Sequence, residues 1–218
     1  MYEEGSFGDI IYAESEYLHD MRKMARGDGH WRNSNPAIKY LTHNLGPLLY
    51  IMDDEVETVT CMEGEILASG KKDASMGNAV ALFKTKKGAV IRILICFDAP
   101  VGVDHNFRLI GTKGTIETDS TKPLEEAHSF AMLSAIPVTL RKKIDIPVSL
   151  AYDSENAGGH GGADKRMMID FINCIIEDRK PILNVDFAIK ISLPGILAHE
   201  SAVQGNMPLA VPFAEDLL

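Results

Sequence analysis

The sequence has little cysteine, little tryptophan and no long apolar run. Three of its 218 residues are cysteines and one is a tryptophan. Three cysteines without C-x-x-C spacing indicate neither a disulfide framework nor a zinc site, and this usage fits a reducing compartment. No apolar run approaches the roughly 20 residues that cross a bilayer. The opening residues 1–5 do not resemble a signal peptide. We therefore expect a cytoplasmic protein with no membrane partner.

Glycine motifs for nucleotide binding are also absent. The dinucleotide fingerprint is G-x-G-x-x-G between a strand and a helix, and the nearest match, Gly159 to Asp164, lacks the last glycine. No P-loop and no G-x-S-x-G nucleophile elbow occurs. The formal net charge of −9 argues against a nucleic-acid partner. We expect no cofactor-binding residues in this chain.

What the sequence does contain predicts an α+β fold. Alternating residues predict a strand over 8–19, and glycine-containing turns join two hairpins. Prolines between 120 and 158 suggest an excursion with one or two edge strands. The prediction is a single domain over residues 1–218, an open, largely antiparallel (mixed) sheet with helices packed on one face. The expected hairpins span 78–98 and 107–118, and the expected helices span 36–52, 163–178 and 187–204.

Two details of the later helices are expected as well. Apolar residues in 163–178 recur at helical spacing and predict a buried stripe. Its members are Met167, Met168, Phe171, Ile172, Ile175 and Ile176. Asp186 is expected to cap the last helix, and Gly205 to end it.

Tyr40 and His43 are the first candidate functional pair. They lie three residues apart in a predicted helix, so they share one face. Pro47 removes a hydrogen bond to the carbonyl of His43 and should kink the helix there. A phenol beside an imidazole can transfer protons or hold hydroxyl groups. The alternative is a buried pair whose partners only satisfy each other.

Further polar residues lie at element boundaries. Tyr17 and His19 point the same way at a strand end, with Asp20 just beyond, where sites tend to be built. Trp31 and Arg32 sit in a glycine-rich loop and could stack on a sugar ring or a nicotinamide, or simply anchor the loop.

His160 lies among glycines before a helix, where the backbone can approach a ligand closely. His19, Asp20, His43 and His160 could together form a metal site, but no predicted helix carries paired histidines at zinc-like spacing. We expect no metal.

The order of these motifs resembles the C-terminal half of the Gfo/Idh/MocA oxidoreductases, the glucose–fructose oxidoreductase and inositol dehydrogenase family. The nearest branch contains the NAD-dependent glycoside hydrolases of family 109, which share the Tyr-x-His-Asp and Tyr-x-Thr-His patterns. The motifs run almost end to end: Gly5-x-Phe-Gly-Asp-Ile-x-Tyr, Tyr17-Leu-His-Asp20, Trp31-Arg32, Tyr40-x-Thr-His-Asn-Leu-Gly-Pro47, Gly111-Thr-Lys-Gly114 and His160-Gly-Gly-Ala-Asp164.

The resemblance implies a substrate-binding and oligomerising C-terminal domain. In that family NAD or NADP binds to an N-terminal Rossmann domain with a Glu-Lys-Pro lysine, and this chain carries neither feature. By resemblance the catalytic residues are Tyr40 and His43. The implied substrate-binding residues are Tyr17, His19, Asp20, Trp31, Arg32, Asn44 and His160.

The implied reaction is oxidation of a sugar or polyol hydroxyl by the intact protein, and the resemblance also implies a homo-oligomer. The chain alone is expected to be inactive and to bind no cofactor. Two alternatives stay open at this point. One is NAD-dependent glycoside hydrolysis of the family 109 type, and the other is a non-enzymatic carbohydrate-binding or dimerisation module.

Overall fold

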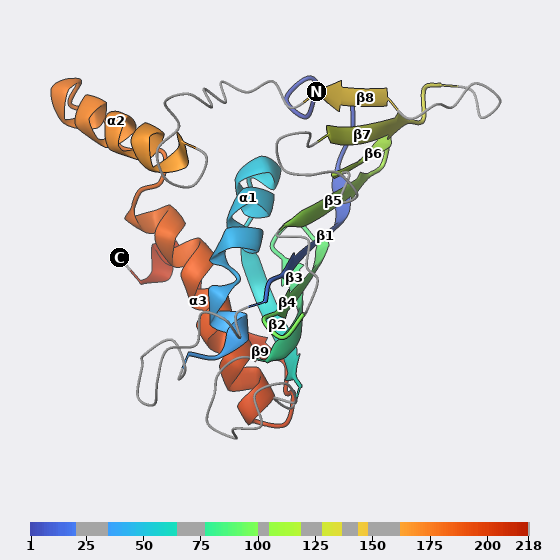
Figure 1. Ribbon diagram of the computed structural model, residues 1–218, viewed down its shortest axis with the longest axis vertical. Helices are drawn as coiled ribbons and strands as arrows, with labels where there is room; N and C mark the ends of the chain where they lie inside the picture. Colours follow the sequence, from blue (N-terminus) through green and yellow to red (C-terminus); the bar gives the residue numbers. More distant parts are fainter. Residues whose placement is uncertain are drawn as a thin grey trace.

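The computed structural model describes residues 1–20, 35–64, 77–99, 105–118, 128–136, 144–147 and 162–217. These residues form one nine-stranded sheet in the order β8-β7-β6-β5-β1-β4-β3-β2-β9 (Figure 1). Within it β1 and β4 run parallel, and the other described pairs are antiparallel. The strands are β1 Ile10–Leu18, β2 Val56–Glu63, β3 Asn78–Thr85, β4 Val90–Cys96, β5 Asn106–Gly111, β6 Gly114–Thr118, β7 His128–Leu133, β8 Ile144–Pro147 and β9 Leu209–Ala210.

Helices cover one face of this sheet. The 3-10 helix η3 (Ala37–Tyr40), α1 (Thr42–Met52) and α3 (Val185–Val203) pack on the central strands, whereas α2 (Ala163–Ile176) projects away on the same side (Figure 1). A short 3-10 turn, η7 (Ala214–Asp216), follows β9. None of the described helices is long and apolar enough to cross a membrane.

The core lies between the helices and strands β1 to β4. Strand residues alternate between faces, so Phe83 of β3 and Ile93 of β4 point inward and are buried. On α1, Leu45, Leu48 and Leu49 share the inward face and are at most 1% exposed. Burying each such side chain stabilises the fold by about 1.5–3 kcal/mol. This packing holds α1 against the sheet and thereby fixes the residues that α1 carries.

The predicted fold class, strands and hairpins are confirmed, with local differences. A bulge between Ile10 and Tyr12 adds a residue to β1, and Ile11 at this bulge is 53% exposed. The helix predicted from Pro36 to Met52 is broken at Leu41, which separates η3 from α1. Tyr40 therefore ends one helix, and His43 lies in the first turn of the next.

Two predictions about the later helices are wrong. The apolar stripe of α2 is exposed, because no described helix or strand packs extensively against it. The N-cap of α3 is Asn184, whose side-chain oxygen accepts a hydrogen bond from the Phe187 amide at 3.0 Å. Asn184 has the extended backbone that an N-cap requires, whereas Asp186 lies within the first turn of the helix, where its negative charge interacts favourably with the helix dipole.

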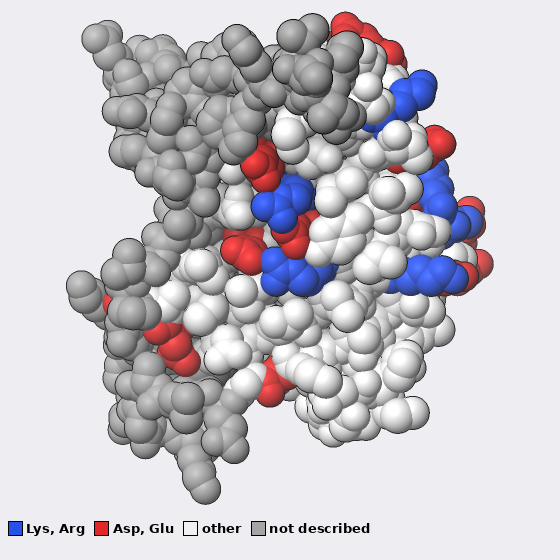
Figure 2. All heavy atoms as spheres, turned by 90° about the vertical axis from the view of Figure 1, so that its right-hand side faces the viewer, with Lys and Arg blue, Asp and Glu red and all other residues white. Residues whose placement is uncertain are grey.

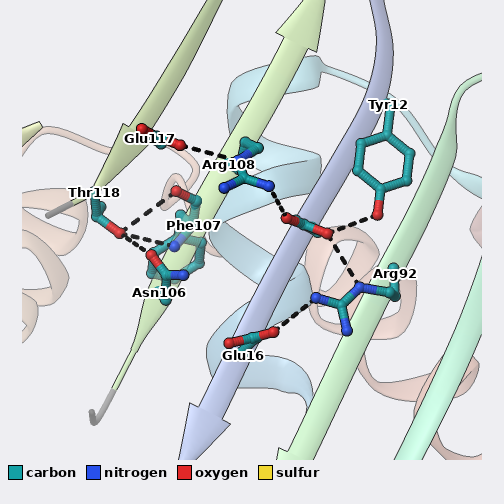
Figure 3. A network of polar contacts seen from close by, with 9 residues as sticks. Tyr12, Glu16, Arg92, Asn106, Phe107, Arg108, Glu117 and Thr118 are labelled. Carbon is teal, nitrogen blue, oxygen red and sulfur yellow. Dashed lines mark hydrogen bonds and ion pairs between the residues drawn. The ribbon is translucent and has the colours of Figure 1, made fainter. Parts of the chain in front are cut away.

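An ion-pair network occupies the face of the sheet that the helices leave open (Figures 2 and 3). Glu14 of β1 lies between Arg92 of β4 and Arg108 of β5, since β1 pairs with both strands. Arg92 Nε donates to one Glu14 oxygen at 3.1 Å and Arg108 Nη1 to the other at 2.6 Å. Tyr12 adds a hydroxyl donor at 2.7 Å. The network continues to Glu16 and Glu117, which pair with Arg92 and Arg108 respectively.

These contacts shift the pKa of Glu14. Burial alone would raise its pKa, because it penalises the charged form. The hydrogen bonds from Tyr12 and Arg92 and the charges of Arg92 and Arg108 outweigh burial, so the net pKa lies below the ordinary 4.5. Glu14 therefore stays ionised in the fold over a wider acidic range than a free carboxyl.

Candidate active site

Tyr17 is the centre of an aromatic and histidine cluster at the carboxyl end of β1. It alternates with Ala13 and Ser15 on the inward face, so its ring meets the helical layer. Tyr17 stacks on Tyr40 of η3 with ring centroids 6.0 Å apart. Its ring centroid lies 6.2 Å from that of His43 on α1. A strand end and two helices thus converge on one place.

Tyr40 and His43 lie side by side, as the sequence predicts. Their ring centroids are 4.9 Å apart and their planes 32° apart. The break at Leu41 does not separate them, because the chain continues directly from η3 into α1. Both rings therefore lie beside Tyr17, where a substrate hydroxyl that reached them could exchange a proton with either.

His105 belongs to the cluster, although the sequence analysis did not single it out. It stacks on Tyr17 with centroids 4.3 Å and planes 16° apart, and it lies 6.0 Å from His43. The cause is strand register: Glu16 pairs with Asn106, so the residue before Asn106 lies opposite the residue after Glu16. A polar Asp104-His105-Asn106 run directly before the predicted hairpin strand was the available signal.

Phe97 and His19 complete the described part of the cluster. Phe97 is 5% exposed and meets both tyrosine rings edge-on, at 5.7 Å for Tyr17 and 5.4 Å for Tyr40. His19 lies edge-on to Tyr17 at 5.6 Å, and its amide donates to the Cys96 carbonyl at 2.9 Å. The His19 Nδ1 atom is buried and has no hydrogen-bond partner among the described residues.

Asn44 lies on the side of α1 that faces the sheet. Its side-chain nitrogen donates to Ser15 Oγ at 2.5 Å, and both residues are at most 1% exposed. A polar contact in so apolar a place fixes one position of α1 on β1, because breaking it strands buried polar atoms. Asn44 thus sets where His43, its neighbour in sequence, lies relative to Tyr17.

The remaining predicted site residues divide into two groups. Asp20 forms an isolated antiparallel bridge with Asp98 just beyond β1, next to the cluster. Trp31, Arg32 and His160 lie outside the described residues. Over the described ranges, no group of three or more His, Cys, Asp or Glu side chains could hold a metal ion.

The described residues do not fit a dinucleotide. A pyrophosphate needs a strand that turns through glycines into a helix N-terminus. In the part of the chain that the structure describes, α1 follows a 3-10 helix and α3 follows the Asn184 cap. Gly162 precedes α2, but Asp164 lies in the first turn there, and its charge would repel a phosphate.

Comparison with known proteins agrees with this geometry. The family model described as the GFO/IDH/MocA C-terminal domain matches residues 1–117, and the glycosyl hydrolase 109 C-terminal domain matches residues 70–215. A glycosyl hydrolase family 109 protein of Solibacter usitatus is 26% identical over 97% of this chain and 55% of its own length. One from Akkermansia muciniphila is 25% identical over 97% of this chain and 52% of its own length. The chain spans about half the length of these curated relatives.

Solved structures share the fold. Levoglucosan dehydrogenase in complex with NADH and L-sorbose superposes with a TM-score of 0.77 at 18% identity, over 97% of this chain and 61% of that one. The aldose-aldose oxidoreductase of Caulobacter crescentus, complexed with glycerol, gives 0.70 at 15% identity over 96% and 58%. Each of the two family models matches more than half of the chain. The chain therefore belongs to the GFO/IDH/MocA family as a C-terminal domain, and the glycosyl hydrolases of family 109 share this domain.

Proposed function

We propose that this chain is the substrate-binding part of an NAD(P)-dependent oxidoreductase that acts on a sugar or polyol hydroxyl. The observation that carries the proposal is the convergence of Tyr17, Tyr40, His43 and His105 at the carboxyl end of β1. Proton-handling groups and flat aromatic surfaces stand together there, as recognition and oxidation of a hydroxylated ring require.

The chemistry divides between this chain and a part that it does not contain. Oxidising a secondary alcohol removes the hydroxyl proton as a hydride leaves the same carbon. The nicotinamide of NAD(P) supplies the hydride acceptor when it is bound in the intact protein. His43 takes the proton or relays it through Tyr40, since either group can lie within hydrogen-bond reach of one hydroxyl. Tyr17 and His105 form the wall on which the sugar ring rests.

Other residues position these groups or contact more distant parts of the substrate. Asn44 acts through its bond to Ser15, which holds α1 and therefore His43 in place. His19 offers its buried Nδ1 atom as a partner for a substrate hydroxyl. Asp20 stands beside it as a second polar contact. For Trp31, Arg32 and His160 the assignment as substrate contacts stays a prediction.

The test fuses the nucleotide-binding half of a family member to the chain, ahead of residue 1. Reduction of NAD(P) by this fusion is then followed across a panel of sugars and polyols. Activity on at least one of them is expected, and His43→Ala should lower kcat by about 10²-fold or more. His199→Ala is the matched control. His199 of α3 pairs with Glu63 of β2, away from the cluster. Unchanged turnover in His43→Ala, or equal losses in both variants, would show that the site lies elsewhere.

A second candidate is glycoside cleavage through transient oxidation with recycled NAD. It is supported by the match to the glycosyl hydrolase 109 C-terminal domain over residues 70–215. The same cluster would serve, because oxidation begins at a ring hydroxyl in both cases. Release of sugar from a chromogenic glycoside without accumulation of NADH identifies this reaction. Stoichiometric NADH identifies the simple dehydrogenase.

We also propose that the protein is a cytoplasmic homo-oligomer that pairs through the open face of the sheet. Val80 and Leu82 of β3 and Val90 of β4 expose between 36% and 45% of their surface there, beside the Glu14 network. Sedimentation velocity tests the assembly. Leu82→Lys should lower the sedimentation coefficient toward that of a monomer, and a wild-type chain that stays monomeric at high concentration would remove this part of the proposal.

A further inference from the structure

Helix α2 exposes the side that a helix normally buries. Seven of its large apolar side chains are between 48% and 75% exposed, and Cys174 is its one buried residue. Arg179, just beyond the helix, donates to Asp170 at 2.6 Å on the opposite side of the helix from this stripe. The exposed residues, here called the α2 stripe, are Met167, Met168, Ile169, Phe171, Ile172, Ile175 and Ile176.

Exposure of such an apolar surface to water is energetically unfavourable. Monomeric proteins rarely expose contiguous apolar patches larger than roughly a few hundred Å². A helix of 14 residues is also marginal without packing, since most helical stability in proteins comes from burial of an apolar face. Three further apolar residues between α2 and the start of α3 are at least 56% exposed, namely Ile182, Leu183 and Val185. This surface is built to be covered.

Position and chain length indicate the partner. Helix α2 lies on the same side of the sheet as α1 and α3 (Figure 1), and Tyr17 faces this helical layer through Tyr40 and His43. The curated relatives are about twice as long as this chain, and the matched domain is described as C-terminal, so their additional part comes first. The proposed chemistry requires that part to face Tyr40 and His43 and therefore to lie over the helical layer.

A cavity on the same side gives a second contact. It measures about 410 Å³ and lies between α1, β5 and β6, with Pro47, Ile51 and Phe107 among its mostly apolar lining. Met1 and Tyr2 form part of its rim. A domain fused before Met1 would join the chain at this rim and so could fill the cavity while it covers α2.

We infer that the α2 stripe is the docking surface for the nucleotide-binding part of the intact protein. This inference rests on the proposed function, because it takes the occupant from that proposal. Docking there orders α2, removes its apolar side chains from water and holds the nucleotide over the Tyr17 cluster. A second copy of this chain is the competing occupant.

Hydrogen exchange measures the docking without using activity. The experiment compares the chain alone with a fusion that carries the nucleotide-binding half of the Solibacter usitatus relative before Met1. Exchange of α2 amides should slow at least about tenfold in the fusion, the factor given by about 1.4 kcal/mol of docking free energy. Protected β3 and β4 amides show that this chain is folded, and NADH fluorescence shows that the added half is folded.

Two matched variants make the result specific. Ile175 is 67% exposed on α2, and Val203 is 66% exposed at the far end of α3. Ile175→Glu should abolish the protection of α2 in the fusion, whereas Val203→Glu should leave it intact. The two substitutions should change the melting temperature of the chain alone by the same amount.

Two other outcomes of the exchange experiment overturn the inference. Both halves folded with α2 still exchanging freely means that the docking surface lies elsewhere, even if the fusion is active. Concentration-dependent protection of α2 in the chain alone, lost in Ile175→Glu, assigns the stripe to a second copy. A protected α2 in an inactive fusion leaves the docking surface standing and counts against the proposed function instead. If the fusion does not fold, the two halves are mixed as separate proteins and crosslinked. The absence of any crosslink between the added half and α2 then refutes the inference.

Discussion

Tyr17 and His105 stack face to face, with ring centroids 4.3 Å apart and planes 16° apart. Tyr17 lies near the end of β1 and His105 directly precedes β5, so the antiparallel register of those strands brings the two rings together. The stack gives His105 a fixed orientation beside His43, 6.0 Å away. A histidine held in this way can present a ring nitrogen to a substrate hydroxyl without losing side-chain freedom on binding.

Replacing His105 separates its shape from its polarity. His105→Phe keeps an aromatic ring on Tyr17 but removes both ring nitrogens. In the fusion enzyme we expect kcat/KM to fall by about 10- to 100-fold, the range for loss of one or two hydrogen bonds in a site. The free energy of unfolding should change by less than about 1 kcal/mol. Unchanged kcat/KM would make His105 a packing residue only.

The hydrogen bond between Asn44 and Ser15 should stabilise the fold measurably. Ser15→Ala leaves the buried Asn44 nitrogen without its acceptor, and we expect a loss of about 1–3 kcal/mol in the free energy of unfolding. Thr60→Ala is the control, because Thr60 donates to the Asn206 carbonyl at an exposed position where water can replace it. Urea denaturation of both variants gives the comparison. Equal losses would mean that burial of the Asn44 pair has no special weight.

Much of the fold follows from local sequence. Period-two alternation and glycine turns identified β3–β4 and β5–β6, because one face of each strand is buried and short turns fix the register. The pairing of β1 with β4 and β5 is long-range and has no local signal. The exposure of the α2 stripe could not be predicted either. Periodicity shows that a helix has an apolar face, and only the surroundings decide what covers it.

The site was predictable in part for the same reason. Tyr40 and His43 are close in sequence, and Tyr17 and His19 share a strand face, so local spacing brings each pair together. His105 joins only through the register of β1 with β5. Asn44 is the opposite case: the family resemblance implied a substrate contact, whereas the turn of α1 directs its side chain to Ser15 on the sheet side of the helix. Helical periodicity separates neighbours in sequence onto different faces.

Glu14 should make stability depend on pH in the acidic range. Its pKa in the fold lies below the ordinary 4.5, despite burial, because of the hydrogen bonds and charges around it. The stabilisation is therefore present above about pH 4.5 and is lost as the pH falls through the lowered pKa. Glu14→Gln should be less stable than wild type at pH 7, and the two should converge once the pH falls below the lowered pKa of Glu14. The measurement is the free energy of unfolding at several pH values.

Glu57→Gln is the control for this prediction. Glu57 pairs with Lys84 at 3.1 Å on the same face of the sheet, but the two side chains are 45% and 60% exposed. An exposed pair contributes about 0–1 kcal/mol. A pH dependence that is the same in Glu57→Gln and Glu14→Gln would contradict a special role for the Glu14 network.

The chain should fold without a nucleotide-binding half and yet bind no NAD. Folding is expected because η3, α1 and α3 bury an apolar core against the central strands within the chain itself. Binding is not expected because the described residues offer no glycine turn between a strand and a helix, and Asp164 stands at the start of α2. Calorimetric titration of NAD and NADH into the chain should give no saturable heat, while the fusion gives a defined endpoint. Saturation of the chain alone with a Kd tighter than about 1 mM, equivalent to about −4 kcal/mol, would contradict the prediction. Loss of that binding in Gly162→Val, but not in Gly205→Val, would then place a nucleotide loop before α2.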